Sequence, residues 1–225
     1  MKENWTKEEL EAAVHAYVIM LNKEANGESF IKKSFYQELA QQFGRTEKAF
    51  EYRMQNISYV YSLMGRRWVA GLKPAKNVGA RVAGELEDLI NEIEGQALPK
   101  VAEFQSTVNT LKKNKNGVSP KGNIKPSKNN VETTQYKRDP KVVAWVINEA
   151  NGICENCDND APFLKDDSSP FLEVHHLRRL ADGGTDTTSN AVAVCPNCHR
   201  ELHFGINKTI LISTLYSKVK RLIVE

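Results

Sequence analysis

Cys195-Pro196-Asn197-Cys198-His199-Arg200-Glu201-Leu202-His203 is the stretch that decides how the C-terminal part of this 225-residue chain folds. Its Cys-x-x-Cys pair matches an earlier pair in Cys154-Glu155-Asn156-Cys157, and these are the four cysteines of the chain. Four thiolates are the closed tetrahedral set that structural Zn²⁺ prefers. Reactive thiols or a thioredoxin-like motif are the alternative, but a redox motif needs only one pair. The spacing therefore predicts a zinc site, and the 37 residues between the pairs predict an inserted element.

Histidines gather in and beside this insertion. His199 and His203 are four residues apart, so in a helix they share one face. His175 and His176 are adjacent in a short apolar stretch that predicts a strand, where neighbouring side chains face opposite sides unless a bulge intervenes. Because the thiolates complete the zinc site, the imidazoles are left for a second metal ion or for a proton. The pattern disfavours a zincin protease, since Glu201 is misplaced for the motif His-Glu-x-x-His.

The combined pattern resembles the HNH (ββα-metal) nuclease motif. Residues from about 138 to 221 are similar to the nuclease domain of McrA-type, modification-dependent (type IV) restriction endonucleases. The stretches that carry this resemblance are Arg138-Asp139-Pro140, Gly152-Ile153-Cys154-Glu155-Asn156-Cys157, Glu173-Val174-His175-His176, Asp186-Thr187-Thr188, Asn190 and Cys195 to His203.

The resemblance implies two strands and a helix that hold one catalytic divalent ion, Mg²⁺, Mn²⁺ or another. It places His175, His199 and His203 at the metal-ligand positions and His176 at the position of the general base. Asn190 matches the residue that braces the loop and orients this base. Many relatives have Pro shortly after the paired histidines, where this chain has Arg178 and Arg179. These two arginines either contact phosphate or are solvated.

The N-terminal part predicts helices. Thr6-Lys7-Glu8-Glu9 is typical of a capping box, and a helix-spaced apolar stripe follows it to Leu21. A short helix from Ser34, stopped by Gly44, and a further helix capped by Thr46 form a helix-turn-helix candidate. Residues 65–74 are expected to be irregular or a short β segment, and another helix is expected to end at Gly95.

Charge and composition divide the chain. Residues 96–138 contain 9 basic and 2 acidic residues, and residues 30–81 contain 10 basic and 3 acidic residues, in a chain of net charge +3. Such basic zones indicate a polyanion partner, or else only a solvated surface. We expect an α+β protein with an α-rich, helix-turn-helix-like domain (1–95), a basic flexible linker (96–135) and a zinc-stapled ββα-metal nuclease domain (136–225).

The domain 1–95 is expected to read DNA and to sense modified bases. Residues 51–58 and 71–79 resemble a helical module found ahead of HNH domains in modification-dependent nucleases. Trp68 is the candidate for contacting a flipped base, although Trp68, Tyr59 and Tyr61 can equally be core aromatics. The residues expected to contact DNA are Arg45, Lys48, Arg53, Gln55, Arg66, Arg67, Trp68 and Lys73, together with Arg178 and Arg179 of the nuclease domain.

The sequence thus predicts an endonuclease that cuts double-stranded DNA carrying modified bases, methylated or hydroxymethylated. A single HNH site cuts one strand, so we expect a homodimer. No membrane span or secretion signal is recognisable, and a cytoplasmic location is expected. Two alternatives stay open: a sequence-specific or homing-type HNH nuclease that is indifferent to modification, and a zinc-containing DNA-binding regulator without catalysis.

Overall fold

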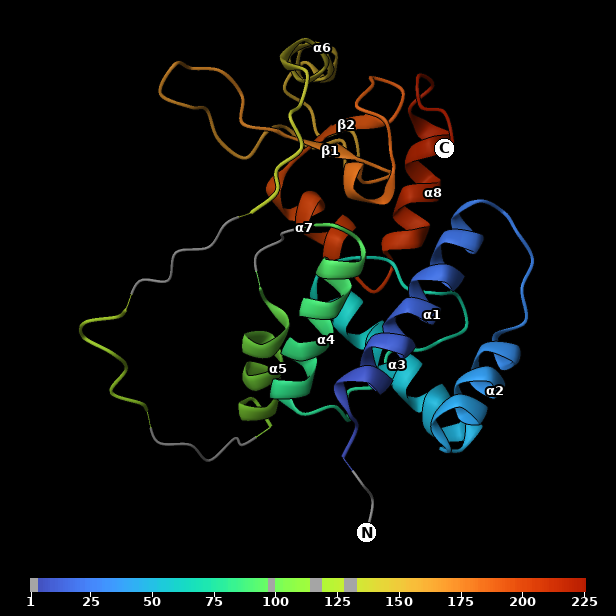
Figure 1. The fold of residues 1–225 in the computed structure, drawn as a ribbon. Helices are drawn as coiled ribbons and strands as arrows, with labels where there is room; N and C mark the ends of the chain where they lie inside the picture. The colour runs from blue at the N-terminus through green and yellow to red at the C-terminus, as the bar shows by residue number, and fades with distance from the viewer. Residues whose placement is uncertain (1–3, 97–99, 114–118, 128–132) are drawn as a thin grey trace. The chain divides into compact units, whose positions relative to one another are not determined.

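The chain forms two compact units, Met1–Thr134 and Gln135–Glu225. The computed structural model describes residues 4–96, 100–113, 119–127 and 133–225. Helices dominate, and a single small two-stranded sheet is present in the described residues (Figure 1). The predicted α+β class is confirmed. In the parts of the chain that the structure describes, no helix combines the length and the apolar character needed to span a membrane.

Five helices make up the N-terminal unit as described: α1 (Lys7–Ala25), α2 (Lys32–Phe43), α3 (Glu47–Leu63), α4 (Ala80–Ile93) and α5 (Ala102–Leu111). The capping box of α1 is present, because the Thr6 hydroxyl accepts from the Glu9 N–H and the Glu9 carboxylate accepts from the Thr6 N–H. Thr46 caps α3 as predicted, accepting from the N–H of Ala49.

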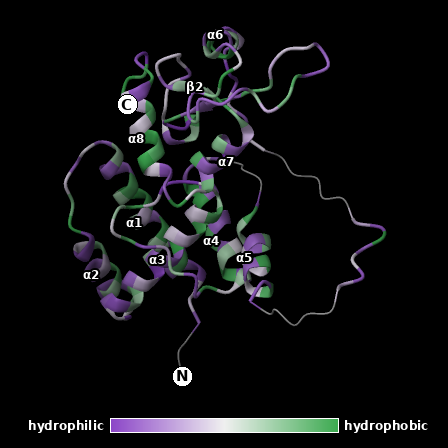
Figure 2. Cartoon of the chain, turned by 180° about the vertical axis from the view of Figure 1, so that it is seen from behind, coloured by the Kyte–Doolittle hydropathy of each residue, from purple (hydrophilic) through white to green (hydrophobic). Residues whose placement is uncertain are grey.

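Apolar faces of α1, α3 and α4 build the core of this unit. Figure 2 shows apolar and polar residues interspersed along these helices, as amphipathic packing requires. Tyr17 is fully buried and its hydroxyl lies 2.8 Å from the Ser58 hydroxyl, while it also accepts from the N–H of Val69. Tyr59 and Tyr61 are core aromatics. The described residues 65–74 form turns rather than a strand, and they are anchored to the core through Val69 and Leu72.

The helix α5 lies at the start of the predicted linker, 96–135. The sequence of residues 96–111 is ambiguous, and the structure forms a helix there that packs against α4. Its N-terminus is fixed by the carboxylate of Glu87, which accepts from the N–H groups of Val101 and Ala102 at 2.8–3.0 Å. Residues 97–99, 114–118 and 128–132 of the predicted linker lie outside the described residues.

The C-terminal unit contains α6 (Pro140–Ala150), β1 (Glu173–His176), the short 3₁₀ helix η1 (Leu180–Asp182), β2 (Ala191–Val194), α7 (Pro196–Phe204) and α8 (Lys208–Lys218). Asp139 caps α6 and Pro140 begins it. The strands are antiparallel, with His175 opposite Val192. Since α7 follows β2 directly and packs against β1, the three elements form a ββα unit (Figure 1).

The C-terminal helix α8 buries only some of its apolar residues. Leu215 is fully buried, but Ile210 is 65% exposed. The helix ends at Lys218, so Val219 and Leu222 reach the core from the turn that follows it rather than from the helix itself.

Candidate metal centres and nuclease site

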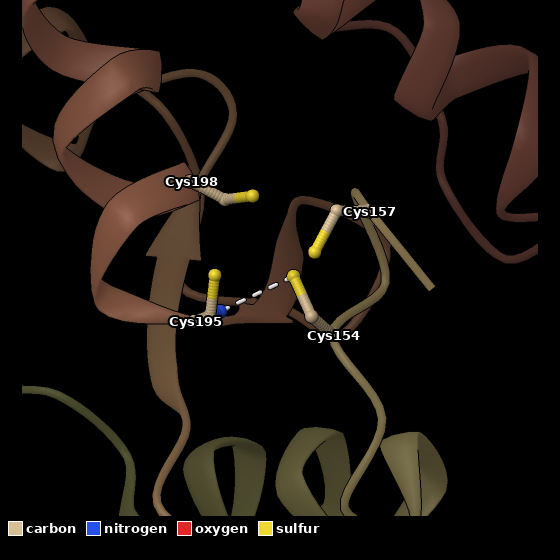
Figure 3. Close-up of side chains that lie close together, drawn as sticks. All are labelled: Cys154, Cys157, Cys195 and Cys198. Carbon is tan, nitrogen blue, oxygen red and sulfur yellow. Dashed lines mark hydrogen bonds between the residues drawn. The ribbon is translucent and has the colours of Figure 1, made fainter. Parts of the chain in front are cut away.

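Four cysteine side chains converge in the C-terminal unit. Cys154 and Cys157 come from the turn after α6, Cys195 follows β2 as the N-cap of α7, and Cys198 lies in the first turn of α7 (Figure 3). Their sulfur atoms all lie within 4.8 Å of one another. This is the donor set and the spacing that a tetrahedral zinc ion requires, so the residues fit the predicted metal.

Nearby N–H groups favour the thiolate form at this cluster. The N–H of Cys195 donates to the Cys154 sulfur at 3.2 Å, and the side-chain amide of Asn156 donates to the Cys198 sulfur at 3.2 Å. Burial alone would raise the pKa of Cys154, but hydrogen bonds from backbone N–H groups outweigh it and lower that pKa below its usual value. Burial raises the pKa of Cys198. A bound cation would overcome this cost, because metal binding favours the deprotonated thiol.

Three histidines form a second cluster. His175 on β1 and His199 and His203 on α7 bring one ligand atom each to within 4.8 Å of the others. The Nε2 atoms of His199 and His203 are 3.2 Å apart, and the ring centroids are separated by 4.7–5.1 Å. Burial, followed by the neighbouring His203 and His199, lowers the pKa of His175 to about 2. His175 is therefore a neutral imidazole, the form that binds a divalent cation.

Glu173 orients one of these rings. Its carboxylate lies 2.7 Å from Nδ1 of His199. Since an ionised carboxylate can only accept, Nδ1 carries the proton and Nε2 presents its lone pair to the cluster. This role was not predicted, although Glu173 and His175 are two residues apart on a strand and so lie on the same face.

His176 is separate from this cluster and faces another carboxylate. Its side chain is 3% exposed, and its Nε2 lies 2.8 Å from an Oδ atom of Asp186. The other Oδ atom of Asp186 accepts from the N–H of Asp139 at 2.6 Å. Burial would raise the pKa of Asp186, but these hydrogen bonds lower it below its usual value, so the carboxylate is ionised at neutral pH. Asp186 was noticed in the sequence only as part of a resembling stretch.

Asn190 is fully buried and holds the loop between β1 and β2. Its side-chain oxygen accepts from the N–H of Arg178, and its amide donates to the carbonyl oxygens of Arg178 and Thr185, all at 2.8–2.9 Å. The backbone at Gly184 lies so close to that of Arg178 that a Cβ on Gly184 would be 2.1 Å from the Arg178 carbonyl oxygen. This geometry matches the bracing position that the resemblance implies.

The residues expected to contact DNA are dispersed. Arg53 and Arg66 are only 8% and 2% exposed, so they cannot present a guanidinium to DNA as predicted. The Arg53 guanidinium lies 4.4 Å from the centroid of the Trp5 ring, and Arg66 pairs with Glu94. Both arginines are held by core partners that the local sequence pattern does not reveal.

The other predicted contacts vary in exposure. Arg45 pairs with Glu9, and Trp68 is half-buried against the core. The remaining candidates are Lys48, Arg67 and Lys73, which are exposed, and Gln55, Arg178 and Arg179, which are half-buried. Lys48 pairs with Glu51, and Arg178 donates to the carbonyl oxygen of Asp182.

Comparisons with known proteins agree with this geometry. Residues 154–205 match the family model described as HNH endonuclease. The chain is 43% identical over 143 residues to the "Type IV methyl-directed restriction enzyme EcoKMcrA" of Escherichia coli (strain K12), a match that covers 63% of this chain and 49% of that protein. The chain thus spans about half the length of this relative. Because the match is longer than the C-terminal unit, it includes part of the N-terminal one.

A solved structure is also similar. The "Type IV phosphorothioation-dependent restriction endonuclease ScoMcrA" is 36% identical, with a TM-score of 0.35, over 37% of this chain and 19% of the other. The family match coincides with the thiolate cluster, the three-histidine cluster and the His176–Asp186 pair. The C-terminal unit of this chain therefore contains an HNH endonuclease domain.

Proposed function

We propose that this protein is a modification-dependent endonuclease that hydrolyses phosphodiester bonds of double-stranded DNA. The observation that carries the proposal is the convergence of three imidazoles, His175, His199 and His203, within the ββα segment that also holds the His176–Asp186 pair. A zinc-containing DNA-binding regulator would need the thiolates alone. A regulator of that kind gives no reason for a second cluster, of three imidazoles, beside a histidine that is oriented by a carboxylate.

His176 is proposed as the general base. The ionised Asp186 accepts the Nε2–H of His176, so Nδ1 is the atom that keeps the lone pair. From that atom the imidazole takes a proton from the water that attacks phosphorus. Asn190 keeps the loop, and with it Asp186, in place during this step.

The three-histidine cluster is proposed to bind the catalytic divalent ion. Bound there, Mg²⁺, Mn²⁺ or a related ion supplies positive charge for the crowded phosphate and the leaving 3′ oxygen. Glu173 holds the ring of His199 in the orientation that this binding requires. The thiolate cluster is assigned to structural Zn²⁺, which stabilises a small unit with a limited core. Cleavage at this site leaves a 5′-phosphate and a 3′-hydroxyl.

Dependence on modified bases is supported by the relative whose name describes it as methyl-directed. We propose that the N-terminal unit contacts the DNA, using exposed cations that include Lys48, Arg67 and Lys73. A homodimer is proposed for double-strand cleavage, since the described residues of each chain contain one three-histidine cluster.

The test is digestion of four plasmids that are alike except for their bases: unmodified, 5-methylcytosine, 5-hydroxymethylcytosine and N6-methyladenine. Each is incubated with the full chain in Mg²⁺, Mn²⁺, Co²⁺ or Ni²⁺, beside the variant His176→Ala. Cleavage confined to one or more modified plasmids and lost in the variant supports the proposal. Equal cleavage of all plasmids would identify a nuclease indifferent to modification, and DNA binding without any nicking would identify a regulator.

A further inference from the structure

The guanidinium of Arg221 joins several separate segments of the C-terminal unit. It makes two parallel hydrogen bonds to the Glu155 carboxylate, at 2.6 and 2.8 Å. It also donates to the carbonyl oxygens of Thr188 and Ala191, at 3.2 and 3.0 Å. The side chain is only 16% exposed, and its partner Glu155 is 12% exposed. A planar guanidinium with five donors is the group suited to such a junction, and lysine cannot replace it.

Glu155, one partner of Arg221, belongs to the first Cys-x-x-Cys turn of the thiolate cluster. Glu155 stands between Cys154 and Cys157, and its carboxylate accepts from the N–H of Ala193 at 2.7 Å. Its own N–H donates to the carbonyl oxygen of Ala193 at 3.0 Å. The turn Cys154–Cys157, called the thiolate knuckle below, is therefore hydrogen-bonded to β2 through Glu155, the same residue that binds Arg221.

The other end of this junction lies on the loop that supports the proposed base. Residues 185–190 include Asp186 and Asn190. The two backbone carbonyl oxygens that Arg221 binds, those of Thr188 and Ala191, lie on either side of Asn190 in the chain. The segment around Arg221 continues this contact. The N–H of Ile223 donates to the carbonyl oxygen of Ser189 at 2.9 Å, and the Glu225 carboxylate accepts from the N–H of Thr185 at 2.9 Å.

We propose that Arg221 is a positioning residue that fixes loop 185–190 against the thiolate knuckle, so that Asp186 and Asn190 hold His176 in its working orientation. The thiolate cluster then contributes to catalysis through Arg221 as well as stabilising the fold. The kinetic part of this inference rests on the proposed function, whereas its structural part does not.

The variants Arg221→Met and Arg221→Lys of the full chain test this, with Lys218→Met as the matched control. Lys218 lies in the same C-terminal segment and contacts the knuckle through the Asn156 carbonyl oxygen and Asp158, but it serves no loop residue in these contacts. Hydrogen exchange by mass spectrometry compares peptides that cover 185–191 with peptides that cover 152–158, and zinc content is measured on the same samples.

Both Arg221 variants are expected to keep their zinc and to exchange at least about tenfold faster in 185–191, with little change in 152–158. For the plasmid that the unsubstituted protein cleaves fastest, kcat should fall by about 100-fold with KM nearly unchanged. A loss of this size is typical of a misplaced catalytic group. The control should match the unsubstituted protein in all of these measurements.

Unchanged exchange in 185–191, or loss of zinc with equal acceleration in both sets of peptides, would overturn the inference. If Arg221→Met does not fold, Arg221→Lys decides, because it keeps the charge beside Glu155 and loses the bonds to the loop. If the unsubstituted protein cuts no DNA, the proposed function fails, while the exchange result still decides the role of Arg221.

Discussion

His176 and Asp186 face each other across the loop between β1 and β2, with an imidazole nitrogen 2.8 Å from a carboxylate oxygen. The imidazole is almost fully buried, and the carboxylate is fixed from its other side by the N–H of Asp139 at the start of α6. The orientation of the proposed base therefore depends on a loop residue ten positions after it and on the start of α6, which precedes it in the chain. Removing either support should change the chemistry without removing the base.

Asp186→Asn tests this dependence. Asparagine keeps the size of the side chain, but its amide can donate to His176 and favour the tautomer whose proton is on the wrong nitrogen. We expect the rate of plasmid nicking to fall by about 10- to 100-fold, the range typical of residues that orient a catalytic group, with melting temperature nearly unchanged. Asp182→Asn, in the same loop, is the control. A nicking rate equal to that of the unsubstituted protein would exclude Asp186 from this role.

Glu173→Gln should weaken divalent-ion binding at the three-histidine cluster. The neutral amide no longer attracts the Nδ1 proton of His199, so Nε2 becomes a weaker ligand. We expect the Kd for Mn²⁺, measured by calorimetry on zinc-loaded protein, to rise by about 10- to 100-fold. The matched control is Glu201→Gln, an exposed carboxylate on α7, which should leave the Kd unchanged. Equal affinities for both variants would contradict the assignment.

The elements that sequence predicted well are those whose signal is local. The cysteine pairs and the spacing of His199 and His203 specify a turn and one face of a helix over a few residues, and the structure has both. The caps at Thr6, Thr46 and Asp139 were recognisable for the same reason, since each acts within three residues of its own position.

Longer-range partners explain what sequence did not reveal. Arg53 has the helical spacing of the buried residues Phe50 and Ile57, and only its charge suggested an outward position; Trp5, which precedes α1, covers it. The helix α5 lies at the start of the predicted linker, and it depends on a carboxylate from Glu87 in another helix. Asp186 is ten residues from His176, and only the path of the loop brings the two together. Burial and pairing of this kind depend on tertiary packing rather than on periodicity.

Arg66 and Arg67 are adjacent but should respond to substitution in opposite ways. The Arg66 guanidinium is 3% exposed and pairs with Glu94, which also accepts from the Tyr61 hydroxyl. Arg66→Ala leaves that carboxylate buried without its cation, so we expect a loss of about 3–5 kcal/mol in the free energy of unfolding of the N-terminal unit. Chemical denaturation measures this loss.

Arg67→Ala should leave that stability within about 0.5 kcal/mol, because Arg67 is exposed. It should instead weaken DNA binding and reduce the dependence of binding on salt concentration by about one counterion, as the loss of one phosphate contact does. Fluorescence anisotropy at several salt concentrations checks this, and an unchanged salt dependence would show that Arg67 does not contact the DNA backbone.

Replacing one thiolate should unfold the C-terminal unit. Zinc binding of this type contributes roughly 10–16 kcal/mol in small domains, more than a unit of this size can lose. For Cys154→Ser and Cys198→Ser we expect loss of the bound zinc, measured by atomic absorption, together with loss of the melting transition of this unit. Chelation of the unsubstituted protein should have the same effect. A variant that retains its melting transition without zinc would show that the thiolates do not stabilise the fold.

Gly184→Ala should displace the loop between β1 and β2 while leaving the thiolate cluster and the three-histidine cluster in place. The added Cβ would lie 2.1 Å from the Arg178 carbonyl oxygen and 2.9 Å from the Asn190 amide, so the backbone has to shift. Because Asn190 braces the loop through that same carbonyl oxygen, we expect the shift to break the brace and to misplace Asp186. Nicking should fall by about 100-fold, while zinc content and Mn²⁺ affinity stay near those of the unsubstituted protein. Gly79→Ala is the control, since a Cβ there meets open space. Full activity of Gly184→Ala would mean that the loop tolerates the shift and that the brace is not needed for catalysis.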